Sequence, residues 1–353
     1  MVLSSEEGSA CFLNFRPLDL NRSASVYTVY FLRAVPVFVC GPNLGAWAPI
    51  FRGSSDRAVA GEPASCYPSL AMPSGQDQAS EQALANQSAL AHFSSFEAHR
   101  QRLTAFTLSA AQTADATLCV LGAGNCFDLD LDALAGRYRA VHLVDLDAAA
   151  LARAFARQQP AAKERIVLHA PLDLSGLLDR IDRWARFQVT PEELMSHADI
   201  TAQQLREGLG GPFDVVLSAC MLSQMQLSVL NVLGDRHRLF EAVRWTLNLT
   251  HFRTLAALTR PLGRALFATD ASSGLLHPLD AILPDTDCVA LLGELSQRGR
   301  VFDFADPTRI APLLRDDPVL RGAFPPFAVS DAWLWSNGPE TKFLVYASEL
   351  QRL

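Results

Sequence analysis

The chain has 353 residues, of which 49% are hydrophobic and 19% are charged, so it can bury a substantial core and is not a disordered polypeptide. Its net charge is −7 and its pI is 5.6. Domains that bind nucleic acid usually carry a basic face, because neutralising phosphates supplies much of their affinity. The nearest basic cluster, Arg180–Arg186, also contains acidic residues, as a solvated helix face does. The composition therefore argues against a nucleic-acid partner.

Seven cysteines are scattered along the chain without a C-x-x-C pair, and no cysteine–histidine cluster has the spacing of a zinc site. They are Cys11, Cys40, Cys66, Cys119, Cys126, Cys220 and Cys288. An odd, scattered set in a chain of this length is typical of reduced thiols. We expect free thiols, no metal site and a cytoplasmic location.

The longest apolar run near the start, Val26–Cys40, predicts no membrane span. It is interrupted by Arg33 and Pro36, and it is shorter than the roughly 20 apolar residues that a helix needs to cross a bilayer. Glu6 and Glu7 stand where a signal peptide carries basic residues. We expect a soluble protein that does not associate with membranes.

Residues 1–71 contain no lysine and no histidine, and frequent Ser, Pro and Gly interrupt any periodic pattern. Two interpretations stay open: a flexible N-terminal extension, or an upstream segment that is not translated because Met72 is the true start. In either case we expect residues 1–71 to be dispensable for folding. Good helix formers then predict a helical segment over residues 72–112, followed by the main domain over residues 113–353.

From residue 113 to residue 270, short apolar runs alternate with helical patterns. Strands that alternate with helices indicate a parallel sheet that is covered on both faces. The predicted strands are Thr117–Leu121, Ala140–Val144, Arg165–His169, Phe213–Ala219 and Ala265–Thr269. The predicted helices include Asp130–Gly136, Ala148–Gln158, Leu174–Phe187, Pro191–Gly208 and Asp235–Leu258.

Two strand-like runs close the chain, Ala332–Ser336 and Lys342–Ala347. The link Asn337–Pro339 is rich in turn formers, which predicts an antiparallel hairpin. The expected fold class is α/β, with a seven-stranded, doubly wound, mostly parallel sheet and a C-terminal antiparallel hairpin.

The segment Val120–Leu131, VLGAGNCFDLDL, closes the first predicted strand and opens a helix. Gly122 and Gly124 let the backbone turn sharply and let a ligand approach where a Cβ would obstruct it. The start of the helix offers free N–H groups to a ligand. The segment therefore predicts a ligand-binding turn, with a plain tight turn as the alternative.

Acidic residues follow the second and third predicted strands. Asp145 ends the second strand, in HLVDLD, where an acid can accept hydrogen bonds from both hydroxyls of a ribose, and Asp147 is its near neighbour. Asp173 follows the third strand, in PLDLSG, where it can accept a hydrogen bond from an adenine amino group. As the alternative, Asp173 or Ser175 can cap the next helix.

The fourth predicted strand lies in the segment Phe213–Met225, FDVVLSACMLSQM. Ligands of open α/β sheets bind at the carboxyl edge of the strands. The residues expected at that edge are Ser218, Ala219 and Cys220. The hydrophobic residues expected to pack in the core just after them are Met221, Leu222 and Met225.

Taken together, these stretches resemble the successive cofactor motifs of the class I S-adenosylmethionine-dependent methyltransferases, over roughly residues 115–348. The expected hairpin also resembles the end of that family's seven-stranded sheet. The resemblance implies a Rossmann-like fold in which Gly122, Ala123 and Gly124 hold the methionine part of S-adenosyl-L-methionine. It also implies that Asp145 holds the ribose.

The same resemblance assigns the rest of the cofactor site. It implies that Asp173 contacts the adenine. It also implies that the methionine and the substrate lie against the end of the fourth strand, at Ser218, Ala219 and Cys220. The implied activity is methyl transfer without a metal, and we expect the acceptor to be an oxygen or nitrogen of a small molecule.

The acceptor is expected over the carboxyl edge, beside Gln224 and Asp270. The helices before the first strand and the segment Pro278–Pro326 are long enough to roof such a pocket, which suits a small molecule. His169 and His277 are the candidate bases, although no catalytic set is evident. The Asn-Pro-Pro-Tyr type signature of amino methylation is absent after the fourth strand.

Two positions depart from the family pattern. Val120 stands where the family commonly has an acid, and Cys126 stands where it commonly has a third glycine. These departures leave open a non-catalytic S-adenosylmethionine-binding protein. An NAD(P)-dependent oxidoreductase is the other alternative, but Phe127 occupies the third glycine position of its fingerprint.

Overall fold

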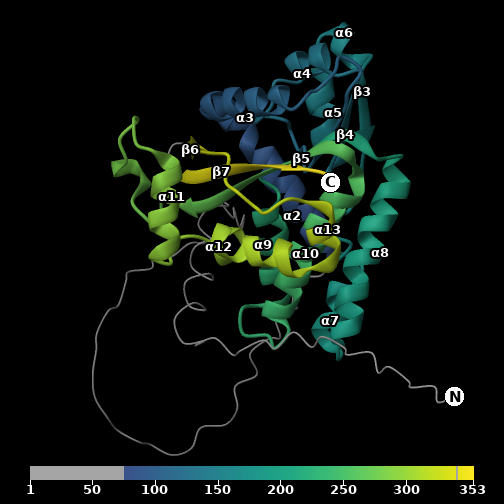
Figure 1. Ribbon diagram of the computed structural model, residues 1–353, viewed down its shortest axis with the longest axis vertical. Helices are drawn as coiled ribbons and strands as arrows, with labels where there is room; N and C mark the ends of the chain where they lie inside the picture. The colour runs from purple at the N-terminus through teal and green to yellow at the C-terminus, as the bar shows by residue number, and fades with distance from the viewer. Residues whose placement is uncertain (1–74, 339–340) are drawn as a thin grey trace, which may run out of the picture.

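Figure 1 shows the computed structural model of the chain, which describes residues 75–338 and 341–353. The predictions made for residues 1–71 lie outside these residues. The described part begins with three helical elements before the first strand: α2 (Gly75–Ser88), η1 (Ala89–Phe96) and α3 (Glu97–Ser109).

The centre of the molecule is a seven-stranded sheet with the strand order β3-β2-β1-β4-β5-β7-β6. The strands are β1 (Thr117–Leu121), β2 (Ala140–Val144), β3 (Ile166–His169), β4 (Phe213–Ala219), β5 (Thr259–Ser273), β6 (Asp331–Ser336) and β7 (Lys342–Gln351). β1 to β5 run parallel, and β7 is antiparallel to both β5 and β6. The predicted fold class is therefore confirmed, including the C-terminal hairpin of β6 and β7.

β5 and β7 are longer than the sequence predicted, because they pair with each other. The predicted strand Ala265–Thr269 extends over the whole of Thr259–Ser273, and its register with β7 includes Arg264 opposite Gln351. A local apolar pattern cannot show this pairing, because the partner strand lies far along the chain.

Helices cover both faces of the sheet. Strand residues alternate between the faces, so Leu118 and Val120 pack with α3, α4, α5 and α6, whereas Cys119 and Leu121 pack with α8, α10, α12 and α13. In Figure 1 these two groups lie on opposite sides of β5 and β7. The remaining helices are α4 (Leu131–Arg137), α5 (Ala148–Ala156), α6 (Pro160–Lys163), α7 (Ile181–Arg186), α8 (Pro191–Leu209), α9 (Leu222–Leu233), α10 (Phe240–Leu258), η2 (Leu279–Ala281), α11 (Cys288–Gln297), η3 (Asp303–Ala305), α12 (Pro307–Asp316) and α13 (Pro318–Ala323).

Capping residues define several of the helix ends. α8 begins after Thr190, whose Oγ1 accepts a hydrogen bond from the N–H of Glu193 at 3.2 Å, and it ends at Gly210, which has φ +69°. The predicted helix Leu174–Phe187 is shorter in the structure, starting at Ile181. The segment before it forms a turn instead, because Gly176 has φ +63° and the side chain of Asp173 accepts hydrogen bonds from this segment.

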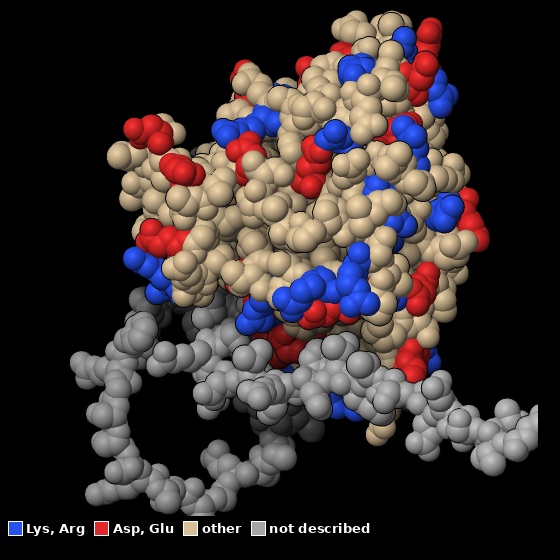
Figure 2. All heavy atoms as spheres, in the orientation of Figure 1, with Lys and Arg blue, Asp and Glu red and all other residues tan. Residues whose placement is uncertain are grey.

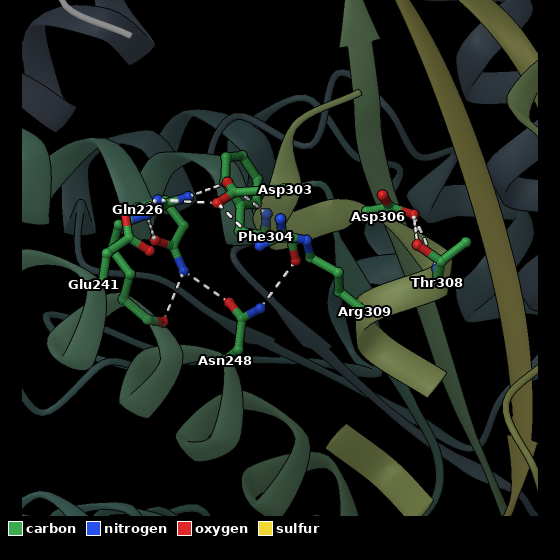
Figure 3. Close-up of polar contacts among 9 residues, drawn as sticks. Gln226, Glu241, Asn248, Asp303, Phe304, Asp306, Thr308 and Arg309 are labelled. Carbon is green, nitrogen blue, oxygen red and sulfur yellow. Dashed lines mark hydrogen bonds and ion pairs between the residues drawn. The ribbon is translucent and has the colours of Figure 1, made fainter. Parts of the chain in front are cut away.

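A buried polar network fixes η3 against α9 and α10 (Figure 3). The guanidinium of Arg244, on α10, donates to Gln226 Oε1 at 3.0 Å and pairs with Asp303. The side-chain amide of Asn248 donates to the carbonyl oxygen of Phe304 at 2.9 Å. Arg244 is 4% exposed, so its charge depends on these partners. The network therefore holds the segment after β5 to the helices that follow β4.

Within the described residues, no helix is both long and apolar enough to cross a membrane. Free thiols were predicted, and the four described cysteines, Cys119, Cys126, Cys220 and Cys288, are free. The other three cysteines lie outside the described residues.

Candidate functional site

The glycine turn joins the carboxyl ends of β1 and β2. The backbone N–H groups of Gly122 and Ala123 both donate to the carbonyl oxygen of Val144, at 3.0 and 3.1 Å. Gly122 has φ +72°, and a Cβ on it would lie 2.6 Å from Met221 Cβ. Only glycine therefore allows this turn to lie so close to the segment after β4.

Cys126 adopts the left-handed conformation, with φ +50°, at the position where the resembled family has glycine. Two arginines hold the backbone on either side of it. Arg157 Nη2 donates to the carbonyl oxygen of Asn125 at 2.5 Å, and Arg100 Nη1 donates to that of Phe127 at 2.7 Å. The left-handed conformation costs a non-glycine residue about 1–2 kcal/mol, and these bonds help to offset it. The sequence contained no local signal for them, because Arg100 and Arg157 lie on α3 and just after α5.

Asp145 and Asp147 have different roles. Asp145 is 6% exposed, and its carboxylate accepts hydrogen bonds from the backbone N–H of Gly124 at 2.7 Å and of Asp147 at 2.8 Å. Burial raises the pKa of Asp145, and the two amides oppose that effect. Asp147 caps α5 through the N–H groups of Ala149 and Ala150. The structure thus ties Asp145, the predicted ribose ligand, directly to the glycine turn.

Asp173 organises the turn after β3. Its Oδ1 accepts hydrogen bonds from the N–H and the hydroxyl of Ser175, at 2.8 and 2.6 Å, and its Oδ2 accepts one from the N–H of Leu178 at 3.0 Å. Ser175 Oγ in turn accepts a bond from the N–H of Leu177 at 3.0 Å. Asp173 and Ser175 therefore hold a turn and do not cap the next helix, because α7 begins later and has Arg180 as its N-cap.

A cavity of about 80 Å³ lies between these turns, α9 and α2. Four of the residues singled out from the sequence line it, namely Gly122, Asp145, Asp173 and Gln224. Further lining residues are Gln78, Gln82, Leu146, Leu172, Leu174, Ser175, Leu177, Leu178, Ile181, Met221, Met225 and Ser228. The cavity therefore brings together the glycine turn and the acids after β2 and β3.

The end of β4 differs from the prediction. Ser218, Ala219 and Cys220 are buried beside the cavity wall, and the wall itself comes from Met221 and Met225. Cys220 has φ +48°, and its N–H donates to the carbonyl oxygen of Ala268 at 3.0 Å. This bend directs the chain into α9, whose first turns then face the cavity. Met221 and Met225 also pack against the hydrophobic core, as expected.

Two acids with raised pKa values, the buried Asp270 and the half-buried Asp128, lie at the same edge of the sheet. Burial raises the pKa of Asp270 to about 6, and Ser223 Oγ donates to its carboxylate at 2.8 Å. Burial, with a contribution from the Asp145 charge, raises the pKa of Asp128 to about 7. Asp270 was expected near the acceptor, whereas Asp128 was missed, because an acid that directly follows the glycine turn has no distinctive spacing.

The candidate bases do not line this cavity. His169 lies on the edge strand β3, where its Nε2 is 2.9 Å from Nδ1 of His142. His277 lines a separate hollow, together with Arg298 and Arg300. The segment Pro278–Pro326 also contributes no lining residue, because α11 packs against β6 and α12 packs against α13. Of the two expected roofs, the structure provides only the one from the N-terminal helices, as α2.

The described residues contain no group of three or more histidine, cysteine or acidic side chains arranged to hold a metal ion. Figure 2 shows basic and acidic side chains interspersed over one face, with some basic side chains gathered together. The overall charge of −7 therefore does not describe each part of the surface.

No protein-family model matches the chain, and no curated protein matches it. Similar solved structures include the N-methyltransferase NodS from Bradyrhizobium japonicum WM9 in complex with S-adenosyl-L-homocysteine, at 14% identity and TM-score 0.35, over 73% of this chain and 87% of that chain. Magnesium protoporphyrin IX methyltransferase from Synechocystis PCC 6803 with bound S-adenosylmethionine matches at 12% identity and TM-score 0.37, over 78% and 84%. The 16S rRNA (adenine(1408)-N(1))-methyltransferase from Catenulisporales acidiphilia matches at 12% identity and TM-score 0.30, over 71% and 93%.

At these identities and TM-scores the likenesses carry no argument about activity. The class of fold follows from this chain's own sheet, in which five parallel strands are followed by an antiparallel hairpin inserted as β7 and then β6. The chain therefore has the Rossmann-like fold of the class I S-adenosylmethionine-dependent methyltransferases, as the motifs predicted.

The prediction of the methyl acceptor, with nucleic acid excluded, is wrong. We expected a small-molecule acceptor and excluded nucleic acid, yet the similar structures include a methyltransferase of 16S rRNA. Net charge is a sum over the whole chain, so it cannot exclude a local surface for nucleic acid. The roof expected from Pro278–Pro326, which also supported a small molecule, does not line the cavity.

Proposed function

We propose that this protein binds S-adenosyl-L-methionine at the cavity and transfers its methyl group. The observation that carries the proposal is the direct bond between the two key motifs. Gly124 donates its N–H to the carboxylate of Asp145 at 2.7 Å, beside a cavity at the carboxyl edge of the sheet. This is where open α/β sheets bind their ligands.

The cofactor's parts are assigned along the cavity. Each carboxylate oxygen of Asp145 accepts one bond from the protein and keeps a lone pair for a ribose hydroxyl. Asp173 Oδ2 likewise keeps a lone pair for the adenine amino group. Gly122, Ala123 and Gly124 receive the methionine part.

The rest of the methionine part faces the end of β4. Ser218, Ala219 and Cys220 are buried and do not line the cavity, whereas Met221, which follows them directly, does. The methionine part is therefore assigned to the Met221 surface, with Ser218, Ala219 and Cys220 preceding it in the chain.

α2 must move outward for the cofactor to enter. The cavity measures about 80 Å³, whereas sites for ligands of this size usually measure roughly 300–1,000 Å³. Hydrogen bonds tie α2 to its surroundings near both ends of the cavity. Asn86 donates to Asp147 at 3.0 Å and accepts from Asn125 at 2.6 Å, and Asn231 donates to Glu81 at 2.8 Å. The chemistry of the lining thus fits the cofactor once this helix opens.

The cofactor supplies an electrophilic methyl group on its sulfonium, so the protein's main task is to orient an acceptor. Positioning alone can lower a barrier by about 7–11 kcal/mol. A base would add roughly 10²–10⁴-fold. We propose a cytoplasmic location from the cysteine content alone.

The proposal is tested by measuring S-adenosylhomocysteine affinity in an Asp145→Ala variant. Losing a charged hydrogen bond costs about 1.5–3 kcal/mol, so affinity should fall about tenfold or more. Asp285→Ala removes an exposed acid away from the cavity and is the matched control. Unchanged affinity in Asp145→Ala, with the control also unchanged, would remove Asp145 from the site.

Catalysis is tested separately with labelled cofactor. Small metabolites, proteins and RNA are each offered as acceptors, with and without EDTA. Transfer that survives EDTA supports the metal-free reaction. Binding without transfer to any acceptor class would favour the non-catalytic alternative.

A further inference from the structure

Gln78, on α2, is a buried polar side chain that the fold does not fully satisfy. It is 4% exposed, and its Nε2 has no hydrogen-bond partner among the described residues. It also lines the cavity proposed for the cofactor. A buried donor without an acceptor is costly and rare in folded proteins, so it calls for a partner that binds in the cavity.

The direction of α2 shows where Gln78 lies relative to the glycine turn. Asn86, near the end of the helix, lies at the glycine turn: its carbonyl oxygen accepts from Asn125 at 2.6 Å, and its Oδ1 would lie 3.3 Å from a Cβ on Gly124. Gln78 lies eight residues earlier, about 12 Å away along the helix axis. It therefore lies toward the end of α2 that is distant from the glycine turn.

The part of the cavity formed by the segment after β3 has the character of a base-binding pocket. This segment contributes apolar side chains, which include Leu174, Leu178 and Ile181, and the polar turn at Asp173. Apolar walls suit the faces of a flat ring, and polar groups at the rim suit its edge. This is the part to which the proposed function assigns adenine.

We propose that Gln78 recognises the adenine of the cofactor, by donating a hydrogen bond from Nε2 to a ring nitrogen. A glutamine side-chain amide offers both a donor and an acceptor to the edge of adenine. The inference rests on the proposed function, and it adds a recognition residue from outside the sheet. It also gives α2 a role when it closes, because the contact forms only with the helix over the cavity.

The test measures binding of S-adenosylhomocysteine and of its 1-deaza, 3-deaza and 7-deaza analogues, each lacking one ring nitrogen. The wild type, Gln78→Leu and the control Gln87→Leu are compared, since Gln87 is an exposed glutamine on the same helix. Gln78→Leu should weaken binding of the parent ligand about three- to tenfold, the range of a neutral hydrogen bond. Gln87→Leu should have no effect.

The analogues identify the contact. For the analogue that lacks the partner nitrogen, the wild type and Gln78→Leu should bind equally well. If Gln78→Leu weakens the parent and all three analogues by the same factor, or weakens none of them, the adenine contact is wrong. If the wild type binds none of these ligands, the proposed function itself fails, which is a different result.

Thermal melting without ligand separates recognition from folding. Replacing an unpaired buried donor with an apolar side chain should leave the melting temperature unchanged or raise it. A clear fall in the melting temperature of Gln78→Leu would show that Gln78 supports the free protein instead, and would contradict the inference.

Discussion

The two halves of the carboxyl edge of the sheet satisfy their buried polar groups in different ways. Over β1 to β3, Asp145, Asp147 and Asp173 each accept two or more hydrogen bonds from the protein. Over β4 and β5, the hydroxyls of Ser218 and Thr269 are buried and have no partner in the described part of the chain. In the first half the protein itself fixes the acidic side chains through hydrogen bonds. In the second half these two hydroxyls have no such bonds within the described residues.

This difference explains which half of the site could be predicted from the sequence. In the first half, most of the hydrogen-bond donors lie within a few residues of the acid that they bind. A short motif in the sequence is therefore enough to indicate the turn and its hydrogen bonds. In the second half, Asp270 depends on Ser223, which lies on another element. Chemistry that is assembled from distant segments leaves no local pattern in the sequence.

The largest expected effect comes from breaking the network behind the second half. Arg244→Met leaves Asp303 and Gln226 without their buried partner. Breaking a buried pair from one side costs about 3–5 kcal/mol. Urea unfolding should show a loss in that range. Arg315→Met, which removes an exposed arginine, should change stability by less than about 1 kcal/mol. Equal effects of the two variants would mean that the network does not hold the helices together.

A pH-dependent change at Asp270 sharpens the comparison. Burial raises its pKa from 3.8 to about 6, so the folded state binds this proton more tightly than the unfolded state. The contribution of this proton to the free energy of unfolding is complete below about pH 4 and is lost as the pH rises through about 6. Asp270→Asn keeps the neutral form. It should match the wild type at pH 4 and exceed it by up to about 3 kcal/mol at pH 7.5. A pH-independent difference would contradict the raised pKa.

In the first half, Asp173→Ala should unfold the turn after β3. It removes the acceptor for Ser175 and Leu178, and the loss of a capping side chain typically costs about 1 kcal/mol. Asp179→Ala, at an exposed acid in the same segment, is the control. Chemical denaturation measures both. A stability unchanged by Asp173→Ala would show that the turn does not depend on its carboxylate.

The smallest expected effect comes from a substitution near the start of β5, at the edge of the sheet opposite the cavity. It serves as a reference for the variants in both halves of the carboxyl edge. Leu262 is 63% exposed and has φ +62°, a conformation that asparagine adopts more readily than leucine. Leu262→Asn should raise stability by about 1 kcal/mol and leave ligand affinity unchanged. A lower melting temperature would show that the leucine side chain contributes to packing.

The sequence predicted the first half well, because β1 and β2 have the predicted bounds and Asp145 lies at the glycine turn. It predicted that the helices before the first strand could roof the pocket, as α2 does, but it could not identify Gln78 and Gln82 as lining residues, because nothing in the pattern of α2 identifies the surface it packs against. The same is true of Arg100 and Arg157, which hold the turn around Cys126 from distant helices. At β4, the bend at Cys220 moved the cavity wall from the predicted residues to Met221 and Met225.

The central claim is that the glycine turn and Asp145 form a site for S-adenosyl-L-methionine. The most direct measurement is a calorimetric titration of the wild-type protein with S-adenosylhomocysteine and, in parallel, with NADH. The account predicts saturable, one-to-one binding of S-adenosylhomocysteine and none of NADH. Binding of NADH without binding of S-adenosylhomocysteine would contradict it and favour the oxidoreductase alternative.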